Sequence, residues 1–239
     1  MNHPESAHSL GQMFDATVLA MAALAEPGEA GNHILRTQHY VRALARKLMA
    51  SPVYAGQLSE QTINTLFLAA PWHDIGNAAV PDRILLKPGA LTVEELEIIR
   101  THPTIGRNTI DQIRLTAGVA MNFLDTARDI AYCHQERWDG GGYPQGLAGD
   151  RIPVAARLMA IADAYDALTN RRVYREGVPH DVAVQQIFQE RAAHFDPDMV
   201  DAFIEIQDEF LAIAQRHADT DVDFQKKIDY MAKAIAESP

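Results

Sequence analysis

Cysteine is nearly absent from the sequence, and the one thiol, Cys133, cannot form a disulfide within the chain. Thiols stay reduced in the cytoplasm, so this is the compartment that we expect. The amino terminus, "MNHPESAHSLGQ", lacks Lys, Arg and an apolar run, which excludes the pattern of a secretory signal. The most apolar stretch, "TVLAMAALA", is too short to span a bilayer. We therefore expect a soluble cytoplasmic protein without membrane insertion.

Positive charge is also scarce. The chain has 21 Lys and Arg against 32 Asp and Glu, which gives a formal net charge of -11. Proteins that bind nucleic acid polymers need a basic surface that displaces counterions from phosphates, so this class is not expected. Any smaller ligand that carries phosphate must be held by a local cluster of basic side chains.

Strand signals are few, whereas apolar residues recur at helical spacing through most of the chain. The pattern predicts an all-α fold, a single helical domain of about eight or nine helices. The helices are expected at residues 10–26, 33–50, 59–75, 92–112, 122–136, 151–169, 179–192, 197–217 and 221–236. The longest irregular segment between them is "DGGGYPQGLAGDRIP", and long ordered loops are often functional.

Three helix starts carry capping signals. Asn32 precedes "HILRTQ", Thr92 stands three residues before Glu95 as in a capping box, and Asp196 precedes a proline at the first helical position.

The pair His73-Asp74 follows the apolar segment "TINTLFLAAPW" and precedes a turn with glycine. Adjacent side chains on a helix point about 100° apart, so the two can serve two metal ions of a hydrolytic site. A His-Asp pair alone is weak evidence, because a second pair, His180-Asp181, opens another expected helix, where an aspartate does ordinary capping and dipole work. Further candidate ligands near expected helix ends are His33, His102, His134 and Asp163. Each of them alone is more often a structural residue.

Taken in order, six segments resemble the motifs of HD-GYP domains, which are cyclic di-GMP phosphodiesterases within the HD metallohydrolase superfamily. They are "GNHILRTQHYVRALA", "HDIGN", "ILLKPGALT", "THPTIG", "HQERWDGGGYPQGL" and "ADAYDALTNRRVYR". The resemblance runs from Phe14 to His217. We therefore expect a tail at residues 1–12, an HD-GYP-like phosphohydrolase domain at 13–220, and a C-terminal helix and tail at 221–239.

The resemblance implies two divalent transition metals, iron or manganese, that share one bridging carboxylate. The first metal is assigned to His33, His73, Asp74 and Asp163, and the second to Asp74, His102 and His134. His73 and Asp74 are the residues expected to be catalytic. Imidazole and carboxylate ligands without thiolates suit Fe or Mn. Glu29, four residues before His33, matches a carboxylate that helps to hold a third metal in some members, and a solvated loop residue is the alternative.

Substrate contacts are implied for a second set of residues. Arg172 and Arg175 match the family's phosphate and guanine contacts, where a planar guanidinium binds in a bidentate manner. Lys87 is a third candidate cation, with a solvated surface charge as the alternative. Asp166 lies one helical turn after Asp163 and could orient either a substrate or another site residue. Tyr143 could pack beside a guanine or brace its own loop, in which Gly142 and Pro144 favour a turn.

Two positions depart from the family pattern. Asn77 stands where the motif usually ends in lysine, so it offers a phosphate no charge although its amide can still form a hydrogen bond. Gln135 stands where a second histidine usually follows His134, and an amide is a poorer ligand for a transition metal than imidazole. We therefore expect the second metal to bind more weakly.

Three functions fit this pattern. The first is hydrolysis of cyclic di-GMP to the linear dinucleotide or to GMP. The second is a catalytically weakened domain that binds cyclic di-GMP, or a diguanylate cyclase (GGDEF) partner through the GYP loop. The third is hydrolysis of another nucleotide, including other cyclic dinucleotides, and a homodimer is compatible with all three.

Overall fold

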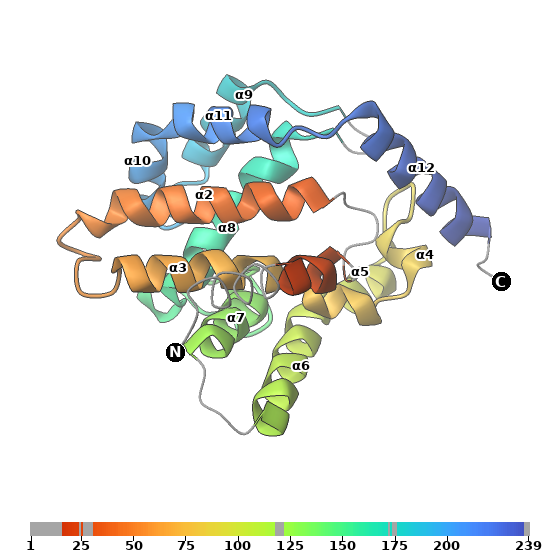
Figure 1. Cartoon of the computed structure of the whole chain (residues 1–239), viewed down its shortest axis with the longest axis horizontal. Helices are drawn as coiled ribbons and strands as arrows, with labels where there is room; N and C mark the ends of the chain where they lie inside the picture. The colour runs from red at the N-terminus through yellow and green to blue at the C-terminus, as the bar shows by residue number, and fades with distance from the viewer. Residues whose placement is uncertain are drawn as a thin grey trace, which may run out of the picture.

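The computed structural model describes residues 16–23, 25, 31–117, 122–171, 173 and 176–236. Most of these residues are helical, including residues 16–23, and none of them belongs to a strand (Figure 1). Arg191 and Phe195 form an isolated bridge. The predicted all-α class is confirmed. The α-helices are α2 (Gly31–Met49), α3 (Glu60–Ala69), α4 (Asp82–Leu85), α5 (Val93–Ile99), α6 (His102–Ala117), α7 (Asn122–Cys133), α8 (Val154–Thr169), α9 (His180–Gln189), α10 (Pro197–Glu205), α11 (Gln207–Arg216) and α12 (Asp221–Ala236). Three short 3₁₀ helices are η1 (Ala70–Trp72), η2 (Ile75–Ala79) and η3 (Gly149–Arg151).

The helix expected at 59–75 ends early because of Pro71. A proline has no amide hydrogen to donate to the carbonyl four residues before it, which here is that of Phe67. The side chain of Gln38 donates to that carbonyl instead, at 2.8 Å. The chain continues as η1, so His73 and Asp74 lie in a turn between two 3₁₀ helices and not at the end of an α-helix.

Two other expected helices are each divided. The segment 92–112 forms α5 and α6, because the ring of Pro103 excludes a helical bond to the carbonyl of Ile99. The segment 197–217 divides at Ile206, whose φ of -118° is not helical. Residues 82–85, expected in a loop, form the short helix α4.

The predicted caps at Thr92 and Asp196 are confirmed. Thr92 and Glu95 form the reciprocal capping box, and the Asp196 side chain accepts from two backbone N–H groups of α10. The predicted cap at Asn32 is wrong, because α2 begins one residue earlier, at Gly31. The first residues of the helix expected at 10–26 lie outside the described part of the chain.

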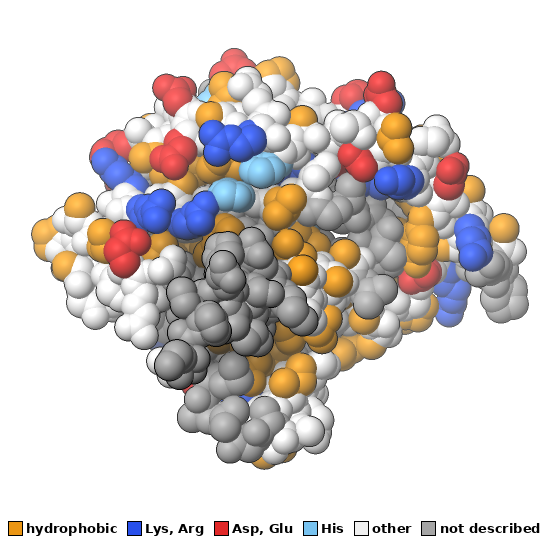
Figure 2. Space-filling view, in the orientation of Figure 1, with side chains coloured by type: hydrophobic (Ala, Val, Ile, Leu, Met, Phe, Trp, Pro, Cys, Tyr) orange, Lys and Arg blue, Asp and Glu red, His pale blue; other side chains and the backbone are white. Residues whose placement is uncertain are grey.

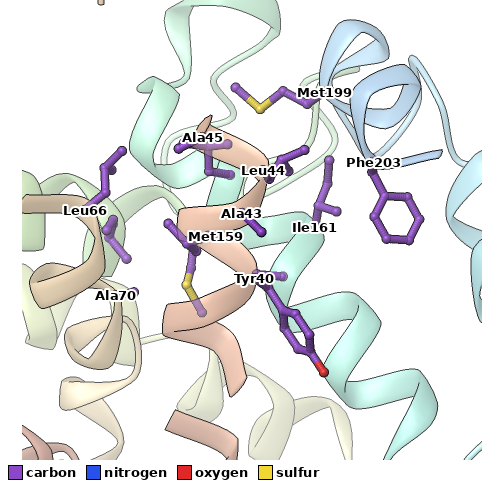
Figure 3. Packing of buried hydrophobic residues seen from close by; sticks show 14 of the residues in the cluster. Tyr40, Ala43, Leu44, Ala45, Leu66, Ala70, Met159, Ile161, Met199 and Phe203 are labelled. Carbon is purple, nitrogen blue, oxygen red and sulfur yellow. The ribbon is translucent and has the colours of Figure 1, made fainter. Parts of the chain in front are cut away.

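The core is built around α2, which runs through the middle of the molecule with α3 on one side and α10 and α11 on the other (Figure 1). Figure 3 shows Tyr40 and Leu44 of α2 lying among Met159 and Ile161 of α8 and Phe203 of α10. Each fully buried side chain of this kind stabilises the fold by about 1.5–3 kcal/mol. This packing holds α2 against α8, and both helices carry candidate metal ligands.

The surface is mixed in charge. On the face drawn in Figure 2, acidic side chains lie among those of Lys and Arg and do not form one block. None of the described helices is long and apolar enough to cross a membrane. The division into a tail, a domain and a C-terminal segment stays a prediction, and residues 1–12 lie outside the described part.

Candidate metal centre

Six candidate ligands come together in the structure, although they are spread over 131 positions of the sequence from His33 to Asp163. They form two groups, and within each group the possible ligand atoms lie within 4.8 Å of one another. The first group is His33, His73 and Asp163, and the second is Asp74, His102 and His134. The neighbouring residues His73 and Asp74 thus join the two groups.

Helix ends position most of these side chains. His33 lies in the first turn of α2, His102 is the first residue of α6, and His134 directly follows α7. The Nδ1 atoms of three histidines lie within hydrogen-bond distance of backbone carbonyls at these helix ends: His73 at 3.0 Å from Ala70, His102 at 2.8 Å from Ile99, and His134 at 3.0 Å from Ile130. A neutral imidazole that donates from Nδ1 keeps the lone pair of Nε2 for a metal.

The second group has the geometry of a ligand triangle. The Asp74 Oδ1 atom lies 3.2 Å from the Nε2 atom of His102 and 3.2 Å from that of His134, and the two Nε2 atoms are 3.3 Å apart. When each of the two histidines carries its hydrogen on Nδ1 and donates it to a carbonyl, both Nε2 atoms are acceptors, as the Asp74 oxygen is. Three acceptors so close repel one another unless a cation lies between them. Metal–ligand bonds of about 2.0–2.2 Å place neighbouring ligands about 3.0–3.5 Å apart, which these separations match.

The electrostatics of this triangle favour positive charge. Burial alone would raise the pKa of Asp74, but the neighbouring imidazoles, His73 foremost, hold it well below its usual value. Burial alone would lower the pKa of His102, but the Asp74 carboxylate raises it. The pKa of His73 is lowered, chiefly by burial, so its imidazole is neutral and able to bind a metal.

The first group is held by a buried ion pair that the sequence did not predict. His33 Nδ1 lies 2.7 Å from Asp166 Oδ2, and the guanidinium of Arg36 donates to both oxygens of that carboxylate, at 2.6 and 3.0 Å. Burial would raise the pKa of Asp166, but His33 and Arg36 lower it to about 2, so the carboxylate is charged. A carboxylate behind a ligating histidine fixes the ring and raises its basicity.

These contacts favour one of the two roles considered for Asp166. It is 2% exposed and both of its oxygens bind within the protein, so contact with a substrate does not fit and orientation of His33 does. Arg36 is itself fully buried and follows His33 by three residues, which is one helical turn. In the sequence, this spacing of three residues was the available indication that Arg36 lies on the same side of the helix as His33.

The loop with the sequence "GGGYP" is fastened beside the second group. The buried carboxylate of Glu136 accepts the N–H groups of Gln145 and Leu147, at 2.8 and 3.0 Å. A Cβ atom on Gly142 would lie 2.3 Å from the backbone nitrogen of Arg137, so only glycine fits there. These contacts place the ring of Tyr143 edge-on to His102, with centroids 6.4 Å apart. Burial raises the pKa of Tyr143 to about 12, so its hydroxyl keeps its proton.

The basic side chains that could bind a phosphate have different surroundings. The ammonium of Lys87 lies 2.6 Å from a carboxylate oxygen of Glu95, which is the residue that completes the capping box of α5. A contact between Lys87 and a substrate would have to compete with this ion pair. Arg100, which the sequence did not single out, lies over the Tyr143 ring at 5.4 Å and is exposed. Within the described residues, Arg100 has no carboxylate partner.

Five further residues complete the set. Asn77 is 7% exposed, and its Oδ1 atom has no hydrogen-bond partner among the described residues. The backbone carbonyl of Gln135 accepts the N–H of Tyr143 at 3.2 Å. The expected metal ligand Glu29 and the expected substrate contacts Arg172 and Arg175 lie outside the described residues.

The second His-Asp pair of the chain lies elsewhere. His180 opens α9 with Asp181 in its first turn, and neither belongs to the two groups. The Nδ1 atom of His180 lies 2.8 Å from the hydroxyl of Tyr165, a contact within the core. The pair thus lies apart from both groups of candidate ligands, and the local role expected for Asp181 at the helix start stays a prediction.

Comparison with known proteins agrees with this geometry. A family model described as "HD domain" matches residues 19–199. A probable cyclic di-GMP phosphodiesterase of Vibrio cholerae serotype O1 is 49% identical over 212 residues, which are 88% of this chain and 48% of that protein. A cyclic di-GMP phosphodiesterase of the same organism is 44% identical over 86% of this chain and 42% of its own length.

Two further similarities concern another cyclic dinucleotide. A 3'3'-cGAMP-specific phosphodiesterase of V. cholerae is 35% identical over 82% of this chain and 35% of that protein. The crystal structure of a cyclic GMP-AMP specific phosphodiesterase of V. cholerae matches with a TM-score of 0.54 at 15% identity, over 93% of this chain and 60% of that one. The structural match shows a shared fold. The chain spans about half the length of the first two curated relatives.

Proposed function

The chain belongs to the HD domain family, and from this premise we propose that it is a metal-dependent phosphodiesterase that hydrolyses cyclic di-GMP. One observation carries the proposal: His73 and Asp74, adjacent in the sequence, belong to two neighbouring groups of metal-binding side chains. Sites of this kind hold two ions about 3.5–4 Å apart in many phosphatases and nucleases. The HD-GYP resemblance and the relatives named as cyclic di-GMP phosphodiesterases support this substrate.

Two divalent transition metals, Fe or Mn, would be held by the six residues of the two groups. When bound, such ions act as Lewis acids toward a phosphodiester and lower the pKa of water. A third ion would need Glu29. The absence of cysteine from both groups agrees with metals that prefer imidazole and carboxylate.

The protein's own side chains perform the remaining tasks. The carbonyls behind His73, His102 and His134 hold the imidazoles in one orientation, so little reorganisation is needed during reaction. The protonated hydroxyl of Tyr143 can donate a hydrogen bond to a ligand at the second group, and the guanidinium of Arg100 can bind a phosphate oxygen. Arg172 and Arg175 are expected to contribute further positive charge.

The test of this proposal is turnover by protein loaded with Mn²⁺ or with Fe²⁺ under anaerobic conditions. Cyclic di-GMP and 3'3'-cGAMP are supplied separately and the products are separated by chromatography. Linear dinucleotide or GMP from cyclic di-GMP is the expected result. Hydrolysis of 3'3'-cGAMP alone would reassign the substrate, an outcome that the 35% identical relative makes worth testing.

Binding without turnover is a second candidate function, and the two departures at Asn77 and Gln135 favour it. In the same experiment it would appear as saturable binding of cyclic di-GMP with no product at full metal occupancy. A diguanylate cyclase partner at the GYP loop, a homodimer and a cytoplasmic location stay predictions.

A further inference from the structure

Asn77 has an unusual environment for an amide. Its side chain is buried, and within the described residues its Oδ1 atom accepts no hydrogen bond. A buried acceptor without a partner costs about 1–3 kcal/mol relative to a satisfied one. The Asn77 Oδ1 atom therefore lacks a partner that would satisfy it, which is either a hydrogen-bond donor or a cation.

A second oxygen without a hydrogen bond lies in the same turn. Asp74 Oδ1, the oxygen of the ligand triangle, is also buried without a hydrogen-bond partner in the described part of the chain. The backbone N–H of Asn77 donates to the carbonyl of Asp74 at 2.9 Å, which closes a 3₁₀ turn. In such a turn, side chains three residues apart nearly eclipse each other, with a rise of about 6 Å between them. Asn77 and Asp74 thus share one side of η2.

The turn of residues 74–77 packs tightly against α6, the helix that begins with His102. A Cβ atom on Gly76 would lie 2.0 Å from the carbonyl oxygen of His102 and 2.7 Å from the nitrogen of Gly106. Only glycine allows this approach, and it brings the residue next to Asn77 onto the first turn of α6. The turn that carries the two buried acceptors, Asp74 Oδ1 and Asn77 Oδ1, is therefore packed against the start of the helix that carries His102.

We propose that Asn77 Oδ1 is a fourth donor to the cation bound by Asp74, His102 and His134. The triangle supplies three donor atoms, whereas Mn²⁺ and related ions take up to about six, so it leaves positions open. An amide oxygen is a neutral, hard donor that suits such ions. It stands in a chain where Gln135 replaces a possible imidazole next to His134. The inference rests on the metal centre of the proposed function and assigns it one more ligand.

The experiment is a titration of metal-free protein with Mn²⁺, followed by calorimetry and by the electron paramagnetic resonance of free Mn²⁺. Wild-type protein is expected to bind two ions, one more weakly. Asn77→Ala should weaken one ion by about 10-fold or more, as loss of a supporting ligand does, and leave the other unchanged. Asn77→Asp, which keeps the oxygen, should bind at least as tightly as wild type. Asn108→Ala, on the exposed part of α6, is the matched control and should change neither ion.

Thermal unfolding separates this role from a merely structural one. Because Oδ1 lacks a partner without metal, Asn77→Ala should melt within about 1–2 °C of wild type in the metal-free state, and should lose part of the stabilisation that Mn²⁺ gives wild type. Two Mn²⁺ ions bound with wild-type affinities in Asn77→Ala would overturn the inference and leave the proposed function intact. Wild-type protein that binds neither Mn²⁺ nor Fe²⁺ would overturn both.

Discussion

His73 and Asp74 are neighbours in the chain, yet their side chains serve different groups of potential metal ligands. The nearest approach between them is 3.8 Å, from His73 Nε2 to Asp74 Oδ2, while Asp74 Oδ1 faces His102 and His134 at 3.2 Å. The turn between η1 and η2 makes this divergence possible. The carboxylate thereby presents one oxygen toward each group, which is the arrangement of a bridging ligand.

The first prediction compares the two His-Asp pairs of the chain. His73→Ala should remove metal from the centre and reduce turnover by at least about 100-fold, because it deletes a buried ligand. His180→Ala is the matched control, since it changes the same residue type in the second pair. Metal content and turnover of His180→Ala should stay near those of wild type. Equal loss of metal in both variants would point to a general folding defect.

The second prediction concerns the carboxylate behind His33. Asp166→Asn keeps the shape but removes the charge that His33 and Arg36 share, and it should weaken the ion of the first group by about 10- to 100-fold. It should also destabilise the metal-free protein, because the buried Arg36 loses one of its two carboxylate partners and keeps Asp219. Breaking a buried ion pair costs at most about 3–5 kcal/mol. Metal competition with a chelator and urea unfolding measure the two effects. Unchanged metal affinity would contradict the role of Asp166 in orienting His33.

The third prediction concerns the cation over Tyr143. Arg100→Ala should raise KM for cyclic di-GMP by about 3- to 10-fold with little change in kcat, since an exposed guanidinium contributes mainly to binding. The control is Arg107→Ala, which removes a similar guanidinium from above the ring of Tyr132, at 4.4 Å. Steady-state kinetics at matched metal occupancy measure KM and kcat for both variants. An equal rise in KM in both variants would show an effect of net charge only.

The fourth prediction concerns the loop that carries Tyr143. Glu136→Gln replaces one of two carboxylate oxygens that accept backbone N–H groups, so an N–H group of Gln145 or Leu147 loses its acceptor. The free energy of unfolding should fall by about 1–3 kcal/mol, and KM should rise because the loop is no longer held in place. Urea denaturation and kinetics test this together. A variant with wild-type stability would show that these two hydrogen bonds do not fasten the loop.

Much of the centre could be predicted because its residues occur in motifs with recognisable spacing. The apolar periodicity gave an all-α fold, and the caps at Thr92 and Asp196 are local features that a few residues specify. The positions of the helix breaks also have local causes, Pro71 and Pro103, but the prediction ran two helices through them. The break at Pro103 releases the carbonyl of Ile99, which holds the imidazole ring of His102.

The remainder depends on contacts between distant segments. The pairing of Arg36 with Asp166 joins residues 130 positions apart, and a buried arginine cannot be told from an exposed one by its spacing alone. Lys87 pairs with Glu95, which also completes the capping box of the next helix, and its expected substrate contact stays a prediction. Local pattern thus indicated the candidate ligands that the structure brings together, but not the side chains that contact them.

Elemental analysis and turnover on the same purified sample test the central claim most directly. Wild-type protein and Asp74→Ala are prepared in parallel, with folding checked by circular dichroism. We predict about two transition metal ions per wild-type chain and hydrolysis of cyclic di-GMP, against fewer than about one ion and no detectable turnover in Asp74→Ala. Two ions per chain in Asp74→Ala would contradict the assignment of this carboxylate as the bridge between the two groups.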